Sequence, residues 1–257
     1  MTARKRVGLA LGAGSAKGLA HIGVIRALKE HDIPIDCIAG CSMGAIIGSM
    51  YACGTDLERL PGFLNAIDEK RFFDYTTSRR GLIAGNNFED FLKLFTHTMN
   101  FEDLDFPYVC IAVDYLKARV HIFDKGPIYK AVRCSMSIPG VIAPSEYLGT
   151  IFVDGSVMER VPITACRTLR PDVVIGVDVG YAGTPMERPK SMLSIVRGCS
   201  DIMVWENTKK QIADADYMIM PRVSHIHSYS LKESDACIEM GYQETLEQVE
   251  AIKALIQ

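Results

Sequence analysis

The sequence lacks any apolar stretch of the length that crosses a membrane, which is about 20 residues. It also lacks a long run of basic residues, and its net charge is −3, so we expect no nucleic-acid partner. Repeats, low-complexity tracts and linker-like segments are absent too. These absences favour one domain spanning residues 1–257.

The N-terminus resembles a signal peptide in one respect, because the basic residues Arg4–Arg6 precede the apolar segment Val7–Ala13. That segment is short and rich in glycine, and Lys17 and His21 follow it closely. A buried first strand explains it better than a secreted leader. We expect a cytoplasmic protein, peripheral to a membrane at most. No basic amphipathic patch is evident, so any membrane-surface contact should be transient.

No two of the eight cysteines are spaced as Cys-x-x-Cys, and several lie inside apolar segments. This pattern is typical of small buried residues in a reducing compartment, not of disulfides or zinc ligands. The cysteines are Cys37, Cys41, Cys53, Cys110, Cys134, Cys166, Cys199 and Cys237.

Apolar runs of strand length alternate with segments of helical periodicity along the chain. This alternation predicts an α/β fold with a mostly parallel central sheet and helices on both faces. The expected strands are 6–11, 35–39, 108–115, 118–124, 149–153, 172–179 and 217–220, and the expected helices include 18–31, 42–53, 128–135, 161–169, 191–213 and 236–256.

Eight of the ten phenylalanines lie between residues 60 and 106. Phe88, Phe91 and Phe95 fall on one face of a predicted helix. We interpret this segment as an insertion, and two roles stay open for it. It is either a cap that meets an apolar substrate or a satellite core beneath a long excursion of the chain.

The stretch Gly40-Cys41-Ser42-Met43-Gly44 lies between a strand-like run and a helix-like run. A Gly-x-Ser-x-Gly at such a junction is typical of a nucleophile elbow, in which the serine has a strained backbone. The two glycines lack a Cβ and let neighbouring elements pass closely. Ser42 is therefore the candidate nucleophile, at the start of a helix whose dipole favours developing negative charge.

A glycine-rich loop follows the first predicted strand. Its spacing resembles a dinucleotide fingerprint, but the acidic residue expected about twenty positions later is absent. We favour a loop whose backbone amides line an oxyanion hole beside Ser42, because consecutive strands tend to be neighbours. The loop consists of Gly12, Ala13, Gly14, Ser15, Ala16, Lys17 and Gly18.

Asp154 and Gly155 end a short predicted strand. An aspartate in a partly dry site can accept the serine proton directly, although Asp-Gly on its own is more often a simple turn. A Ser–His–Asp triad is the alternative, with Asp178 or Asp154 as acid and His225 or His227 as base. Both histidines lie in a polar stretch, and we interpret His21 as a packing or capping residue.

Four blocks, in this order, resemble the patatin-like phospholipases, especially their small single-domain bacterial members. The blocks are Gly12–Gly18, Gly40–Gly44, Ser135–Gly140 and Asp154–Ser156. The resemblance covers about Val7–Pro162, and the C-terminal third fits by predicted secondary structure only.

The resemblance implies a three-layer α/β/α sandwich related to the α/β-hydrolases. It implies a carboxylic ester hydrolase of phospholipase A or lysophospholipase type, with Ser42 as nucleophile, Asp154 as general base, and no histidine, metal or cofactor. Ser42 would attack the ester carbonyl of a lipid or other acyl ester, and water would release the fatty acid from an acyl-enzyme. The alternative is a regulatory or adaptor protein of the same fold with a weak or vestigial dyad.

The sequence departs from the family pattern at four positions. Ala13 replaces a usual glycine but keeps its amide. Lys17 replaces arginine and keeps the charge without the planar fork. Cys41 replaces threonine and is expected to pack inward. Ser156 replaces glycine or alanine, and its hydroxyl could bond Asp154 and lower its basicity.

Overall fold

The computed structural model describes residues 4–68, 72–77, 79–180, 182–183, 186, 188–224, 226 and 233–257. Its centre is an eight-stranded sheet of order β5-β6-β3-β2-β1-β7-β8, with β4 also paired to β3. The strands are β1 Val7–Leu11, β2 Cys37–Cys41, β3 Tyr108–Asp114, β4 Arg119–Phe123, β5 Ser145–Tyr147, β6 Thr150–Asp154, β7 Val173–Val177 and β8 Tyr217–Ile219.

Strands β3, β2, β1, β7 and β8 lie side by side in that order, and each adjacent pair among these five is parallel. Antiparallel pairing is confined to one side, where β4 and β6 pair with β3 and β5 pairs with β6. The predicted mostly parallel α/β sheet is therefore confirmed, and β1 and β2 are neighbours as expected.

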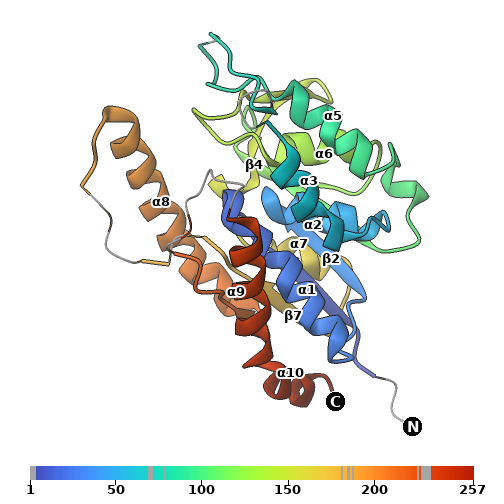
Figure 1. Cartoon of the computed structure of the whole chain (residues 1–257). Coiled ribbons are helices and arrows are strands. Elements are labelled where there is room, and N and C mark those ends of the chain that lie inside the picture. Colours follow the sequence, from blue (N-terminus) through green and yellow to red (C-terminus); the bar gives the residue numbers. More distant parts are fainter. Residues whose placement is uncertain are drawn as a thin grey trace.

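Helices cover both faces of the sheet (Figure 1). Because side chains alternate along a strand, Ile38 of β2 joins the larger core, whereas Cys37, Ala39 and Cys41 join a smaller core under α7. The helices are α1 Ala20–Glu30, α2 Met43–Ala52, α3 Leu60–Ala66, α5 Asn86–Phe95, α6 Ile128–Ser135, α7 Ile163–Thr168, α8 Met192–Gln211, α9 Ser234–Leu246 and α10 Val249–Ile256, and the short 3₁₀ helix η1 is Ser15–Leu19.

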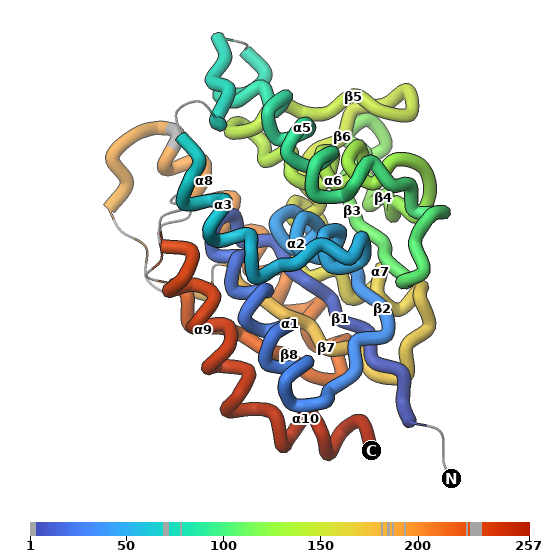
Figure 2. The backbone as a smooth tube through the Cα atoms, turned by 45° about the vertical axis from the view of Figure 1, so that its right-hand side comes forward, coloured from blue at the N-terminus to red at the C-terminus, as the bar shows by residue number. Residues whose placement is uncertain are grey.

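The prediction of one continuous C-terminal helix over 236–256 is wrong. The chain breaks between α9 and α10 at Glu247–Gln248, and the change of direction buries Val249 and Ile252 in the core. Figure 2 shows α5 toward the end of the molecule opposite the two termini, with α3 between it and α9. No helix in the described part of the chain has the length and apolarity to span a bilayer.

Candidate active site

Ser42 occupies the sharp turn between β2 and α2. Its φ of 54° and ψ of −119° lie where non-glycine residues are rarely found. A Cβ on Gly40 would lie 2.4 Å from the Cα of Ala45, and a Cβ on Gly44 would lie 2.1 Å from the carbonyl oxygen of Leu11. Only glycine fits at these two positions, so the strand-to-helix turn has the tight geometry that the sequence predicted.

The Ser42 turn is held in place by α6. The backbone N–H of Ser42 donates to Oγ of Ser135, the last residue of α6, at 2.8 Å, and both residues are buried. The amides of Met43 and Gly44 stand at the first positions of α2, where a helix has no internal acceptor. The positive end of α2 therefore lies beside the Ser42 hydroxyl.

Asp154 reaches Ser42 because two strands meet end to end along β3. Strand β4 occupies one edge of β3 over both Ile111 and Ala112. On the other edge, Ile111 pairs with Cys41 of β2 and Ala112 pairs with Asp154 of β6. The C-terminal ends of β2 and β6, which run in opposite directions, therefore meet on that edge. This meeting places Asp154 next to the turn that carries Ser42.

The Asp154 side chain is buried, with 1% of its surface exposed. Its backbone N–H donates to the Ser137 carbonyl, and its Oδ1 accepts from the Ser156 N–H, both at 2.9 Å. Burial raises the pKa of the Asp154 carboxyl, and hydrogen bonding from Ser42 and Ser156 opposes part of that rise. Oδ2 has no hydrogen-bond partner among the described groups. The Ser42 hydroxyl thus lies near the carboxylate without satisfying Oδ2.

The glycine-rich loop is fastened to the body through its first two residues. The Gly12 N–H donates to the Val177 carbonyl at 2.9 Å, and the Ala13 N–H donates to the Arg160 carbonyl at 3.0 Å. Nε2 of the buried His21 lies 2.8 Å from the Gly12 carbonyl oxygen, and burial lowers the His21 pKa to about 4. The neutral ring therefore donates from Nε2, so His21 anchors the loop in the packing role that we expected.

These bonds narrow the set of oxyanion donors. The Gly12 and Ala13 amides are engaged and cannot also donate to a bound oxyanion. Ser15 and Ala16 line the same cavity as Ser42 and occupy the first two positions of η1, where amides lack an internal acceptor. The candidate donors in the loop are accordingly the amides that follow Ala13.

Three of the departures from the family pattern have defined surroundings. Nζ of Lys17 donates to the Ser224 carbonyl at 3.2 Å. Cys41 is fully buried with its Sγ 3.8 Å from Oδ1 of Asp154, and burial raises the pKa of its thiol well above the usual value. Such a thiol is not a nucleophile. Ser156 reaches Asp154 through its amide, and its side chain lowers the Asp154 pKa as expected.

The alternative triad finds little support in the described residues. Asp178, the alternative to Asp154 as the acid of this triad, forms a buried ion pair with Arg160. His225 and His227 lie outside the described residues. Within the described ranges, no group of three or more His, Cys, Asp or Glu side chains is arranged to hold a metal ion.

An apolar cavity of about 90 Å³ adjoins Ser42. Phe72, Phe73, Phe88 and Phe91 of the phenylalanine-rich segment contribute to its wall. Their rings also pack on one another, with centroids of Phe72 and Phe88 4.8 Å apart. The same side chains therefore pack with the core and line the cavity, and the role of the segment as a cap over a substrate stays a prediction. The other lining residues are Ser15, Ala16, Leu19, Met43, Ile46, Leu60, Leu64, Ile83, Met136, Ile138, Val141 and Ile142.

Arg133 of α6 joins this segment to the site. Its guanidinium donates to the carbonyls of Ala84, Gly85 and Ala143 at 2.8 to 3.0 Å and to Oγ of Ser137 at 2.8 Å. Ser137 in turn accepts the backbone N–H of Asp154, and Ser135 holds Ser42. The turn after α6 therefore supports both candidate catalytic residues.

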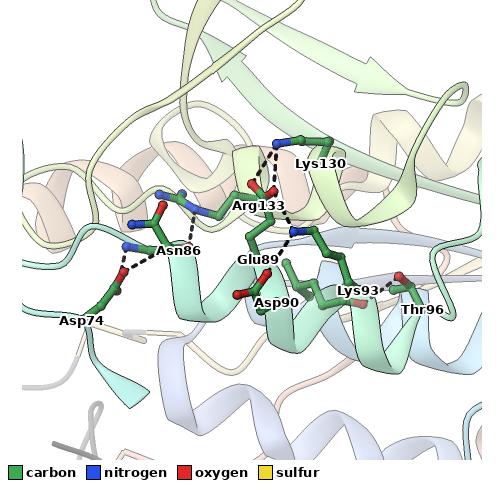
Figure 3. Close-up of polar contacts among 10 residues, drawn as sticks. Asp74, Asn86, Glu89, Asp90, Lys93, Thr96, Lys130 and Arg133 are labelled. Atoms are coloured by element: carbon green, nitrogen blue, oxygen red, sulfur yellow. Dashed lines mark hydrogen bonds and ion pairs between the residues drawn. The ribbon is translucent and has the colours of Figure 1, made fainter. Parts of the chain in front are cut away.

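Further polar contacts fix α5 against α6 (Figure 3). The Asp74 carboxylate accepts the N–H groups of Gly85 and Asn86 at the start of α5. Glu89 of α5 pairs with Lys130 of α6 at 2.8 Å. The cavity wall is thus tied to the helix that positions Ser42.

A sequence model of the patatin-like phospholipases matches residues 9–167, which contain the loop, the elbow and Asp154. The chain belongs to the patatin-like phospholipase family. It is 36% identical over 177 residues to an uncharacterised NTE family protein of Mycobacterium tuberculosis, covering 68% of this chain and 49% of that protein. It is 35% identical over 183 residues to lysophospholipase nte1 of Neurospora crassa, covering 68% of this chain and 12% of that protein.

The patatin-like chain therefore spans about half the length of its mycobacterial relative. Among solved structures it resembles VipD from Legionella pneumophila, with a TM-score of 0.66 over 96% of this chain and 67% of VipD. The identity is 13%, so this likeness concerns the fold alone.

Sequence reasoning missed the roles of Arg133, Ser135 and Ser137. The sequence indicated the block Ser135–Gly140 only as one of the four blocks that resemble the family. Its position between the elbow and Asp154 was the available signal, but the contacts with Ser42 and Asp154 depend on tertiary structure.

Proposed function

We propose that this chain is a serine acyl hydrolase that cleaves fatty-acyl ester bonds of lipids, with Ser42 as nucleophile and Asp154 as general base. The observation that carries the proposal is the meeting of β2 and β6, which sets a strained serine beside a buried carboxylate. A buried carboxylate with an unsatisfied oxygen costs stability, and such groups gather at functional sites.

The environment of Asp154 supports its role as base. Burial raises its pKa, so the carboxylate binds a proton more strongly than an exposed aspartate would. A base is most effective when its pKa approaches the working pH. The unpartnered Oδ2 is the atom that is available to accept the Ser42 proton.

The reaction then runs in two steps. In the first, Oδ2 of Asp154 takes the Ser42 hydroxyl proton while Oγ attacks the ester carbonyl carbon. We assign the donors of the oxyanion hole to the amides of Ser15 and Ala16 and of Met43 at the start of α2, because these positions begin helices and lack internal acceptors. The C–O bond to the alcohol breaks, Asp154 returns its proton to that oxygen, and the acyl group remains on Ser42.

In the second step, Asp154 takes a proton from water as the water oxygen attacks the acyl-enzyme carbonyl. Collapse of the new tetrahedral species breaks the bond to Oγ, and the proton on Asp154 passes to Ser42. The fatty acid leaves and the free dyad is restored.

The cavity favours an apolar acyl group. Apolar side chains, Phe72 and Phe91 among them, form almost the whole wall of this cavity of about 90 Å³, so it suits the hydrocarbon part of a lipid ester. The fungal relative is named a lysophospholipase. We therefore propose lipids with a single acyl chain as the substrate class.

Labelling with a fluorophosphonate tests the dyad without a choice of substrate. We expect rapid labelling of the native chain, none of Ser42→Ala, and a decrease of about 10²-fold or more in Asp154→Asn. The matched controls are Ser49→Ala, a buried serine of α2 that bonds the Ile46 carbonyl, and Asp114→Asn, a buried aspartate of β3.

Both controls should keep native labelling rates. Equal labelling of native chain and Asp154→Asn would exclude Asp154 as the base. A folded native chain that takes up no probe would instead favour the regulatory or adaptor role.

A further inference from the structure

The C-terminal half of helix α8 packs against the body of the protein. Asn207 and Gln211 donate to the Met158 carbonyl, each at 2.6 Å, and Trp205 packs against the guanidinium of Arg160. Of the described α8 side chains, only that of Thr208 is buried. The N-terminal turns project from the body (Figure 1), and Figure 2 shows the same projection from another side.

The outward face of these turns is apolar and uncharged. Five of its side chains are 46% to 81% exposed, which is unusual for residues of this type grouped on one face. Each member is three or four residues away from another member, so they form one stripe along the helix. The stripe consists of Met192, Ile195, Val196, Cys199, Ile202 and Met203.

The face turned toward the body is polar instead. Arg197 and Asp201 lie on the same side of the helix as Trp205 and Thr208, because residues four and seven apart share a face. Burial lowers the pKa of Lys17, nearby Arg197 lowers it further, and Asp201 opposes them. The polar face of α8 therefore borders the glycine-rich loop, and the usual arrangement of an amphipathic surface helix is reversed.

Charge and area indicate what covers the stripe. Residues 186–211 carry Arg188, Lys190, Arg197, Lys209 and Lys210 against Glu187, Asp201 and Glu206, a net charge of +2 in a chain of net charge −3. Basic residues therefore bracket the apolar stripe at both ends. One face of three helical turns offers on the order of a few hundred Å², less than the ~800 Å² per partner of a stable protein interface.

We propose that the α8 stripe docks on an anionic lipid surface. The apolar side chains enter the boundary between headgroups and acyl chains while the flanking lysines and arginines face the phosphates. The benefit of docking rests on the proposed function: α8 borders the loop beside Ser42, so docking would bring a lipid substrate to the cavity. Docking itself requires no catalysis.

Vesicle flotation with the Ser42→Ala chain tests the proposal, because this variant cannot consume the lipid. Vesicles are phosphatidylcholine alone, or phosphatidylcholine with one quarter phosphatidylglycerol. We expect binding to the anionic vesicles and at least a tenfold weaker partition for the triple variant Met192→Gln, Ile195→Gln, Met203→Gln. These positions are exposed, so the variant should fold.

The matched control is Leu116→Gln with Leu148→Gln, two leucines with 64% and 63% exposure that follow β3 and β5, toward the other edge of the sheet from β8. This double variant should bind anionic vesicles as tightly as the Ser42→Ala chain does. Native chains carrying the α8 substitutions should still hydrolyse a soluble short-chain ester, which separates docking from catalysis.

The proposal is overturned if the Ser42→Ala chain does not bind anionic vesicles, or if the triple α8 variant and the leucine control bind them equally. It is also overturned if light scattering shows a dimer that the α8 substitutions convert to monomer while these substitutions leave vesicle binding unchanged. In that case a second copy of the chain is the occupant.

Discussion

Ser135→Ala is the most informative single perturbation of the site. The Ser135 hydroxyl is the acceptor for the Ser42 N–H, and the site is fully buried. The substitution leaves that N–H without a partner, which costs about 1–3 kcal/mol. A backbone such as that of Ser42, with φ 54°, itself carries about 1–3 kcal/mol of strain and persists only while its surroundings hold it.

The turn should therefore relax in part, and Oγ should move relative to Asp154. We expect a loss of stability of about 1–2 kcal/mol, or about 2–8 °C in Tm. We also expect kcat to decrease about 10- to 100-fold, equivalent to about 1.4–2.7 kcal/mol. KM should change little, because Ser135 does not line the cavity.

The assay is steady-state hydrolysis of a chromogenic acyl ester, together with thermal unfolding. Ser49→Ala is the control, since Ser49 is equally buried but bonds a carbonyl of its own helix. A Ser135→Ala enzyme with native kcat and a lowered Tm would show that the bond stabilises the fold without positioning the nucleophile. That result would refute the reasoning.

Three further outcomes follow from the surroundings of Asp154 and of the cavity. Because burial raises the Asp154 pKa, kcat/KM should increase with pH through a value above the ~3.9 of a free aspartate. The free energy of unfolding has the opposite pH dependence, because the stabilisation from protonated Asp154 is present below pH ~3.9 and is lost as the pH rises through the raised pKa of Asp154. Asp154→Asn should therefore increase Tm at pH 7. A decrease in Tm measured by calorimetry would contradict a raised Asp154 pKa. Ile138→Trp places a large ring in the cavity wall, and hydrolysis of a fourteen-carbon ester should decrease at least about tenfold while an acetate ester changes less than about twofold; equal losses on both esters would mean that the cavity does not hold the acyl chain.

Much of the fold was predictable because its signals are local. Helix α6 has the bounds expected from the sequence, and β1, β2 and β7 follow apolar runs that end in Gly, Ser or Asp. The C-terminal helix was predicted as one element because the break at Glu247–Gln248 has no proline or glycine. The direction of α10 is set by burial of Val249 and Ile252, which the local sequence does not encode.

The sequence alone determined the local geometry of the turn at Ser42 and the family of the chain. Glycine is required at positions 40 and 44, two residues before and after Ser42, because a Cβ there would collide with the backbone of neighbouring segments. The order of the four blocks pointed to the family. These features depend on residues near in sequence, so their pattern is visible in one dimension.

Tertiary structure decided how those parts meet. Ser42 and its partner Ser135 are 93 positions apart, and Cys41 and Asp154 are brought together by pairing with the same edge of β3. The outward direction of the apolar α8 stripe was likewise invisible, because periodicity gives two faces but not which one the body covers. Long-range strand pairing and burial fix such relations, and neither follows from the spacing of residues along the chain.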